Sequence, residues 1–559
     1  MISSRLTLLS ALAAVLGVYL AVSSGGHIPF LGMYAYPDLY EATIEELQEG
    51  LKKRRFTSVD LVKAYFRRID EVNIKGPGLR AIIETNPNAL KQAAELDEER
   101  RSKGARGPLH GIPILLKDNI ATLHSEGMNT TAGSYALHGS VVPDDATVSA
   151  KLRAAGAILL GKASLSEWAH WRGKIPSGFC GLAGQCTNPY VPLGNPSGSS
   201  SGSGVAMAIG LAAGSLGSET DGSIISPSSH NNIVGIKPTV GLTSRAGVVP
   251  ISEHQDSVGP MCRTVTDVAI ILGAIVGPDP RDNYSLAQPA VVPDYTQALR
   301  ADGLKGARLG VPRNAFENSD VNHVIEFNKA LEIMRGLGAT IVDPADFEGH
   351  AGEWDPNRLW ELEARVLCGD FKVNVEQYIS KLIEVPTGVK TLNDIIEFNK
   401  THADKELIEP FWTDQVTSSS SSLEESDLAK QDATYWHALL HDYEMGREKG
   451  IDGALKQYNL DAILMPTSKA SRPAAVAGYP VISVPLGFQP ADVALEAANP
   501  TRMNGPHMPF GIAFLGTAYS EFNLIKYAYA YEQGTHVRLR QKAYPEAIPK
   551  TQLKDVVGK

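Results

Sequence analysis

Two glycine- and serine-rich segments and one distant lysine are the parts of this chain best suited to chemistry. The segments are Gly194–Gly204 (GNPSGSSSGSG) and Ser215–Ser226 (SLGSETDGSIIS), and a small-residue apolar stretch, Val205–Gly214, joins them. Lys117 stands far upstream, directly after the apolar run Ile112–Leu116. These residue types suit a hydrolase that uses serine as the nucleophile and lysine, rather than histidine, as the base.

The chemistry places specific demands on these residues. A serine hydroxyl is a weak nucleophile that needs an adjacent base. A lysine can be that base only when neutral, and burial favours the neutral form. Gly222, just before Ser223, allows a close backbone approach, so successive N–H groups there could form an oxyanion hole. The alternative is a flexible linker and a surface lysine, but a linker would be rich in glycine and serine throughout.

Two motifs in the same region resemble other sites. Gly198–Gly202 matches the G-x-S-x-G nucleophile elbow, which needs a strand immediately before it. Thr187–Pro196 precedes it and contains three prolines, so we expect no strand there. Gly156–Lys162 resembles a phosphate-binding loop, but Ala163 stands where serine or threonine is required. Its AILL stretch predicts a buried structural strand.

Histidine and cysteine offer further alternatives. Three histidines lie near the serine segments, and we interpret them as structural because nothing in the sequence pairs them with a serine: His110, His230 and His254. The four cysteines do not follow the spacing of a metal site: Cys180, Cys186, Cys262 and Cys368. Cys180 and Cys186 are close enough to form a disulfide in an oxidising compartment, or they are two buried thiols.

Helices and strands must position these residues. Thr43 begins a capping box with Glu46, which predicts a helix, and Thr57 and Ser58 open a second one. Apolar runs predict four strands: Ile112–Leu116, Ala157–Leu160, Ala462–Met465 and Val481–Val484. Their alternation with helical segments indicates an α/β fold.

Composition and the N-terminus bound the remaining possibilities. The 559 residues carry a net charge of −10, which leaves no basic footprint for nucleic acid. Arg5 precedes an apolar run, Leu6–Val22, and small residues follow at Ala21-Val22-Ser23. Residues 1–23 are predicted to be a cleaved signal peptide of a secreted protein, with an uncleaved membrane anchor as the second reading.

Several motifs in order resemble the amidase signature family. Its lysine motif matches GIPILLK at Gly111–Lys117, its serine-rich loop matches SGSSSGS at Ser197–Ser203, and its nucleophile loop matches ETDGSI at Glu219–Ile224. Three later stretches continue the likeness: Val234–Ser252, Asp256–Asp267 and Ala477–Phe488. The resemblance covers about residues 40–547, with a helical, less characteristic insertion at about 290–450.

The family's catalytic residues carry over to three positions: Lys117, Ser199 and Ser223. The resemblance also implies a cis peptide bond before Ser199, the serine that bridges Lys117 and Ser223. The adjacent Ser200 is the alternative bridging serine, and if Ser199 has that role, Ser200 is expected to help hydrogen-bond the lysine. The oxyanion-hole amides fall on Thr220, Asp221, Gly222 and Ser223. Ser197 and Ser201 replace loop glycines, Glu219 stands for an aspartate, and Asp221 replaces a glycine, which changes the charge beside the hole.

The resemblance implies a single large α/β domain whose mixed, mostly parallel sheet is covered by helices on both faces. It implies an amidase that hydrolyses a small-molecule carboxylic amide through an acyl-enzyme, with no cofactor or metal. Two alternatives are an amidotransferase subunit that passes ammonia to a partner and a non-catalytic binding protein on this scaffold. Membrane contact is expected only through the N-terminal apolar segment.

Overall fold

The structure, a computed structural model, describes residues 36–317, 319–348, 356–415 and 429–559. The predicted signal peptide or anchor, residues 1–23, lies outside the described residues. Within the described part of the chain, no helix combines the length and the apolar character needed to cross a membrane.

The first two helices begin where the sequence places them. Helix α2 (Ile44–Lys52) starts after a reciprocal capping box between Thr43 and Glu46, and α3 (Ser58–Val72) starts after a second box at Thr57. Each box pairs orphan backbone N–H groups with side-chain oxygens, which fixes the start of the helix. Both predicted helices are confirmed.

The described residues form one large sheet with this strand order: β1 (Ile82–Thr85), β3 (Ile158–Ala163), β2 (Pro113–Lys117), β6 (Gly214–Glu219), β8 (Ser257–Cys262), β7 (Val234–Lys237), β12 (Val481–Phe488), β13 (Pro509–Leu515), β11 (Ala462–Pro466), β9 (Arg308–Gly310) and β10 (Thr340–Val342). The four predicted strands are confirmed as β2, β3, β11 and β12. A short hairpin, β4 (Phe179–Cys180) with β5 (Gly184–Gln185), stands apart.

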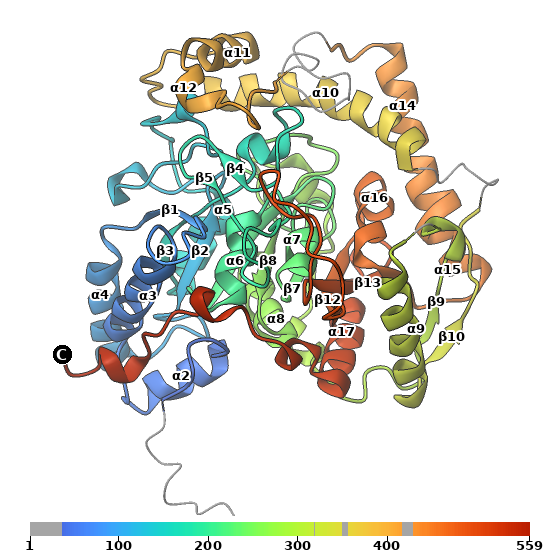
Figure 1. Cartoon of the computed structure of the whole chain (residues 1–559), viewed down its shortest axis with the longest axis horizontal. Coiled ribbons are helices and arrows are strands. Elements are labelled where there is room, and N and C mark those ends of the chain that lie inside the picture. Colours follow the sequence, from blue (N-terminus) through green and yellow to red (C-terminus); the bar gives the residue numbers. More distant parts are fainter. Residues whose placement is uncertain (1–35, 318, 349–355, 416–428) are drawn as a thin grey trace, which may run out of the picture. The chain divides into compact units, whose positions relative to one another are not determined.

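The sheet is mixed, and its pairing changes along its width. Strands β3, β2 and β6 are parallel, as are β11, β9 and β10, while the strands from β6 through β13 to β11 pair antiparallel. One set of helices packs on one face: α5 (Thr147–Ala154), α8 (Val265–Ile275) and α17 (Glu521–Thr535). Another covers the opposite face (Figure 1): α6 (Ser201–Ala208), α7 (Ile225–His230) and α16 (Thr467–Ala477). The single α/β domain with helices on both faces is confirmed.

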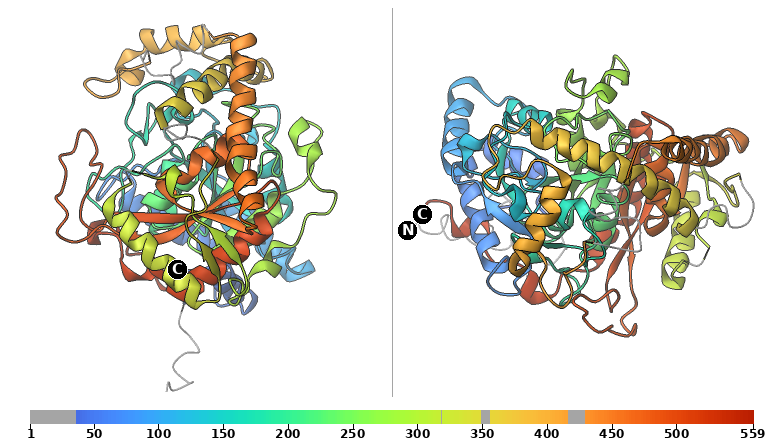
Figure 2. Two further views of the ribbon diagram at one scale, coloured as in Figure 1. Left: turned by 90° about the vertical axis from the view of Figure 1, so that its right-hand side faces the viewer. Right: turned by 90° about the horizontal axis from the view of Figure 1, so that it is seen from above.

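The segment at about 290–450 is mostly helical. Its helices are α9 (Val321–Gly336), α10 (Pro356–Ser380), α11 (Leu392–Thr401), α12 (Ala403–Glu406) and α14 (Ala433–Tyr443), and α15 (Asp452–Gln457) follows. Helices α10, α11 and α14 gather on one side of the core (Figures 1 and 2). The same segment adds β9 and β10 to the sheet, which the sequence analysis missed because three-residue strands show no measurable alternation.

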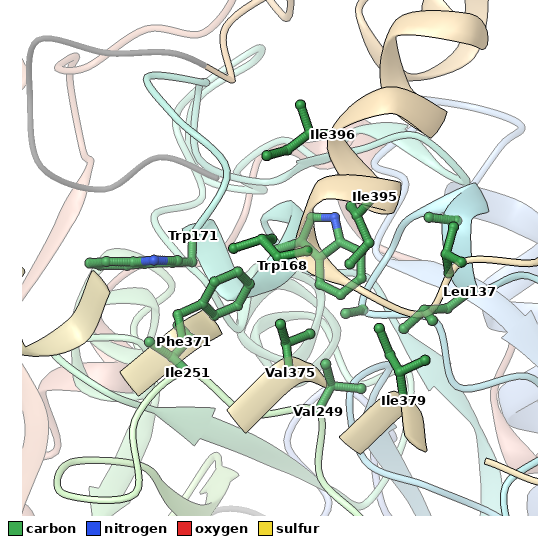
Figure 3. Close-up of a cluster of buried hydrophobic side chains, with 14 of the residues drawn as sticks. Leu137, Trp168, Trp171, Val249, Ile251, Phe371, Val375, Ile379, Ile395 and Ile396 are labelled. Carbon is green, nitrogen blue, oxygen red and sulfur yellow. The ribbon is translucent and has the colours of Figure 1, made fainter. Parts of the chain in front are cut away.

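A cluster of buried apolar side chains packs α10 and α11 against the core (Figure 3). Phe371 of α10 packs between Trp168 and Trp171, with ring centroids 6.5 and 6.4 Å away. Ile395 and Ile396 of α11 complete the cluster from the other side. The two tryptophans belong to a short turn whose backbone, through Ser166, contacts the serine-rich loop described below.

Removing the ring of Phe371 should therefore destabilise the protein. Phe371 is fully buried, and replacing a buried aromatic side chain by alanine costs about 3–5 kcal/mol of unfolding free energy. Urea denaturation of Phe371→Ala, followed by tryptophan fluorescence, measures this loss. Val373→Ala on the exposed side of the same helix is the control, and an equal loss there would contradict the assigned role.

Candidate active site

Lys117 ends the buried strand β2 and is itself fully buried. Its Nζ atom lies 2.7 Å from Ser199 Oγ and 3.0 Å from the carbonyl oxygen of Ser218. Strand β2 is parallel to its neighbour β6, so the carboxyl ends of the two strands meet at one edge of the sheet. Ligands bind at such edges in open α/β sheets, and this register brings the lysine to the serine segments.

Ser199 lies in the loop just before α6. The Gly198–Ser199 peptide bond is cis, as the resemblance implies. The carbonyl of Ser199 accepts the N–H of Ser166 at 2.9 Å, which ties the loop to the turn that carries the tryptophans. Ser200 contacts the same carbonyl as Lys117, donating its hydroxyl to Ser218 O at 3.1 Å. Lys117 therefore contacts Ser199 directly, and the adjacent Ser200 is not its hydroxyl partner.

Ser223 lies in the short loop between β6 and α7. Its carbonyl accepts the N–H of Ser200 at 3.1 Å, which joins the two serine loops. Glu219 Oε2 accepts the backbone N–H groups of Ile224 and Ile225 at 2.6 and 2.9 Å and so closes the loop. Gly222 has φ +82°, a left-handed conformation that favours glycine.

The backbone of this loop offers free donors. Among the described residues, no acceptor is paired with the N–H groups of the four residues assigned to the oxyanion hole: Thr220, Asp221, Gly222 and Ser223. A row of unpaired N–H groups beside a serine hydroxyl is the geometry of an anion-stabilising hole.

The environment of Lys117 favours its neutral form. Burial lowers the pKa of Lys117 to about 7, and the nearby Asp256 and Glu219 carboxylates oppose that shift. Burial also raises the pKa of both carboxyl groups, so their opposition is limited. A lysine with this pKa has a substantial unprotonated fraction at neutral pH and can accept a proton.

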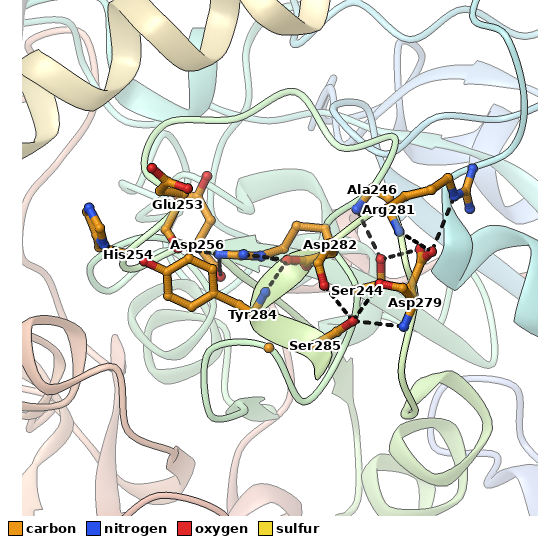
Figure 4. A network of polar contacts seen from close by, with 12 residues as sticks. Ser244, Ala246, Glu253, His254, Asp256, Asp279, Arg281, Asp282, Tyr284 and Ser285 are labelled. Atoms are coloured by element: carbon orange, nitrogen blue, oxygen red, sulfur yellow. Dashed lines mark hydrogen bonds and ion pairs between the residues drawn. The ribbon is translucent and has the colours of Figure 1, made fainter. Parts of the chain in front are cut away.

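Asp256 is held in place beside the loop that carries Thr220 and Ser223. Its carboxylate accepts the Thr220 hydroxyl at 2.6 Å and the backbone N–H of Ile251 at 2.7 Å. The segment that carries it is anchored by Arg245, which pairs with Asp282 at 2.6 Å. Asp282 belongs to a network that also includes Ser244, Asp279 and Ser285 (Figure 4). The network fixes the loop that positions Thr220.

A cavity of about 600 Å³ opens beside this network. Among the described residues, its lining includes Asp256, Arg245 and Tyr284, but neither Lys117 nor the two serines of the site. The cavity thus borders the site through Asp256 without containing its reactive groups.

The competing histidine and cysteine interpretations end differently. The three histidines have other partners: His110 contacts Leu96 O, His230 contacts Ser226 O, and His254 contacts tyrosine hydroxyls. Cys180 and Cys186 are buried free thiols, so the disulfide alternative is wrong in this structure. The described residues directly before the G-x-S-x-G segment form no strand, as expected. The segment that resembles a phosphate-binding loop contains the buried strand β3, which confirms the prediction of a structural strand.

Several residues around the site were missed by the sequence analysis. Asn119 donates to the hydroxyl of Ser218 at 2.9 Å, and Arg472 of α16 lies 3.5 Å from Asp221. Asn119 stands two residues after the lysine and could have been found by that proximity. Arg472 could not, because it lies far from Asp221 in sequence and belongs to no matching motif.

Comparison with known proteins identifies the family. The profile of the family described as Amidase matches residues 60–525. A protein of Arthroderma benhamiae whose name places it among amidases is 40% identical over 546 residues, covering 93% of this chain and 90% of that protein. The X-ray structure of native peptide amidase from Stenotrophomonas maltophilia matches with a TM-score of 0.79 and 38% identity, covering 93% of this chain and all of that one.

A more distant likeness bears on the amidotransferase alternative. A glutamyl-tRNA(Gln) amidotransferase subunit from Geobacter metallireducens is 32% identical over 512 residues, covering 89% of this chain and 98% of that protein. This identity is lower than that of the protein from Arthroderma benhamiae. The chain belongs to the Amidase family and is an amide-hydrolysing enzyme.

Proposed function

We propose that the enzyme cleaves its amide through an acyl-enzyme on Ser223, with Ser199 and Lys117 as a proton relay. The observation that carries the proposal is the 2.7 Å contact between Lys117 Nζ and Ser199 Oγ in a fully buried setting. A lysine must be neutral to act as a base, and burial favours the neutral form. The bond between Ser200 N and Ser223 O holds the nucleophile's loop against the loop of Ser199.

In the first half-reaction, the Ser223 hydroxyl attacks the amide carbon as its proton passes to Ser199. The Ser199 proton passes in turn to neutral Lys117. The new C–O bond leaves a negative oxygen, which the free N–H groups of residues 220–223 stabilise. The relay then returns a proton to the leaving nitrogen, the C–N bond breaks, and an acyl ester remains on Ser223.

In the second half-reaction, water attacks the ester carbon and gives its proton to the same relay. The tetrahedral intermediate collapses, the carboxylic acid leaves, and Ser223 regains its proton. These steps balance with side chains alone, so the proposed mechanism uses no cofactor or metal.

The substrate class is proposed from the likeness to the peptide amidase. That enzyme's name supports a peptide whose C-terminal carboxamide is cleaved to acid and ammonia, and the alternative is a non-peptide amide. A panel of peptide amides and of acyl amides of graded length, assayed by ammonia release from the purified chain, tests this. Cleavage of the acyl amides alone would overturn the peptide assignment. Ammonia release that requires an added partner would favour the amidotransferase alternative.

The pKa of Lys117 makes a pH prediction. Because the base must be unprotonated, kcat/KM should rise with pH and level off above about 7, falling about tenfold per pH unit below that value. Initial rates on an amide that does not ionise between pH 5 and 9 measure the profile. A rate that falls as pH rises through 7 would mean that the lysine acts in its charged form.

A further inference from the structure

A group of buried carboxyl side chains surrounds one arginine beside the serine loop. Arg472 Nε lies 3.5 Å from Asp221 Oδ2 and 3.0 Å from Glu363 Oε2. Glu363 belongs to α10 and is fully buried, and its second oxygen accepts the side-chain amide of Gln255 at 2.8 Å. Asp442 of α14 is also buried, and the nearby Glu363 helps to raise its pKa, while Arg472 opposes that shift.

Asp221 creates an electrostatic problem at this place. Its backbone N–H is one of the four assigned to the oxyanion hole, yet its side chain is a carboxylate. A negative charge so close to a developing oxyanion opposes the charge that the hole must stabilise, and the opposition is strong where water is excluded. The family pattern has glycine at this position, which carries no such charge.

The two other carboxyl groups near Arg472, those of Glu363 and Asp442, have raised pKa values. Burial, with a further contribution from the Asp221 charge, raises the pKa of Glu363. Burial, with Glu363 adding to it, raises the pKa of Asp442 to about 9. Burial therefore favours the uncharged forms of Glu363 and Asp442, while the Arg472 guanidinium lies 3.5 Å from the Asp221 carboxylate.

We propose that Arg472 is a positioning residue for the oxyanion hole. It holds the Asp221 carboxylate and neutralises its charge, so that the N–H groups of residues 220–223 can stabilise the negative charge that develops on the substrate oxygen. Glu363 of α10 holds the same guanidinium through its Nε atom, at 3.0 Å. The inference rests on the proposed role of residues 220–223. Through Glu363, the helical segment from 290 to 450 then helps to position the oxyanion hole in addition to covering the core.

A double-mutant cycle separates this role from a merely structural one. Arg472→Gln in the natural background should lower kcat by about 10- to 100-fold with little change in KM, because the loss is in transition-state stabilisation. In an Asp221→Asn background, whose own kcat is the reference, the same substitution should lower kcat by no more than about threefold further. Arg472→Lys, which keeps the charge but not the planar fork, should fall between these results.

Arg365→Gln is the matched control, since Arg365 of α10 also pairs with a carboxylate, Asp432 just before α14 at 3.1 Å, but does not contact the loop of residues 220–223. Its kcat should stay within about twofold of the unmodified enzyme. Equal losses from Arg472→Gln in both backgrounds, a change confined to KM, or no loss in either would overturn the inference. If Arg472→Gln does not fold, Arg472→Lys in the two backgrounds gives the same comparison.

The failure of this inference is distinguishable from failure of the proposed mechanism. A fluorophosphonate adduct on Ser223, mapped by mass spectrometry, supports the nucleophile whatever Arg472 does. An adduct on Ser223 together with no coupling between Arg472 and Asp221 would overturn only the positioning role.

Discussion

Ser223→Ala should abolish amide turnover, by more than about 10⁴-fold in kcat, while leaving the fold intact. The substitution removes one hydroxyl from a loop whose shape is held by Glu219, by Gly222 and by the bond from Ser200. No other group can form the acyl ester in the proposed mechanism. Turnover of a peptide amide by the purified variant, measured as ammonia release, gives the result directly.

The label and a neighbouring serine supply the controls. Fluorophosphonate treatment of the natural enzyme should modify the peptide that contains Ser223, and the variant should not react. Ser228→Ala, which removes a buried hydroxyl that donates to Ile224 O at 2.7 Å in the following helix, should keep its activity and its labelling. An adduct on Ser200 would instead favour the nucleophile-elbow interpretation.

Lys117→Ala should lower the rate of amide hydrolysis by about 10²- to 10⁴-fold or more, which is the contribution typical of general acid–base catalysis. The loss should be larger for an amide than for the matching ester. In the proposed relay, an amine leaving group needs the proton that Lys117 returns, whereas an alkoxide leaves more readily without it. Parallel kcat/KM measurements on an amide and an ester with the same acyl group give the ratio that tests this role.

Lys162 offers a matched lysine on the adjacent strand β3. It is equally buried, and burial lowers its pKa to about 8, but its ammonium group donates to Ile120 O at 2.6 Å and to Thr130 Oγ1 at 3.0 Å. Lys162→Ala should lower the unfolding temperature without changing the amide-to-ester ratio. An unchanged ratio in Lys117→Ala as well would contradict the relay.

The parts of the fold that were predicted are those with strong local signals. The capping boxes at Thr43 and Thr57 specify helix starts through neighbouring residues, and the runs that became β2 and β12 are mostly apolar. The short strands β9 and β10 carry no such signal, because their place depends on pairing with β11 far along the chain.

The same distinction applies to the site. Lys117, Ser199 and Ser223 stand in motifs that can be matched one by one, and the structure brings Lys117 and Ser199 into contact. Asp256 and Arg472 act across the fold, and their partners lie 36 and 251 residues away along the chain. Such long-range contacts arise only when the sheet closes, so neither role could be derived from local spacing.

The strand order has a consequence for how the protein is made. Strand β7 ends at Lys237 and pairs with β8 along one edge, but its second edge pairs with β12, at residues 481–488. Strand β13 follows only at residues 509–515. During synthesis from the N-terminus, the middle of the sheet therefore keeps an unpaired edge until most of the chain has emerged from the ribosome. Unpaired strand edges are prone to aggregate. We expect the nascent chain to depend on chaperones late in translation, and truncations before β12 to be insoluble rather than partly active.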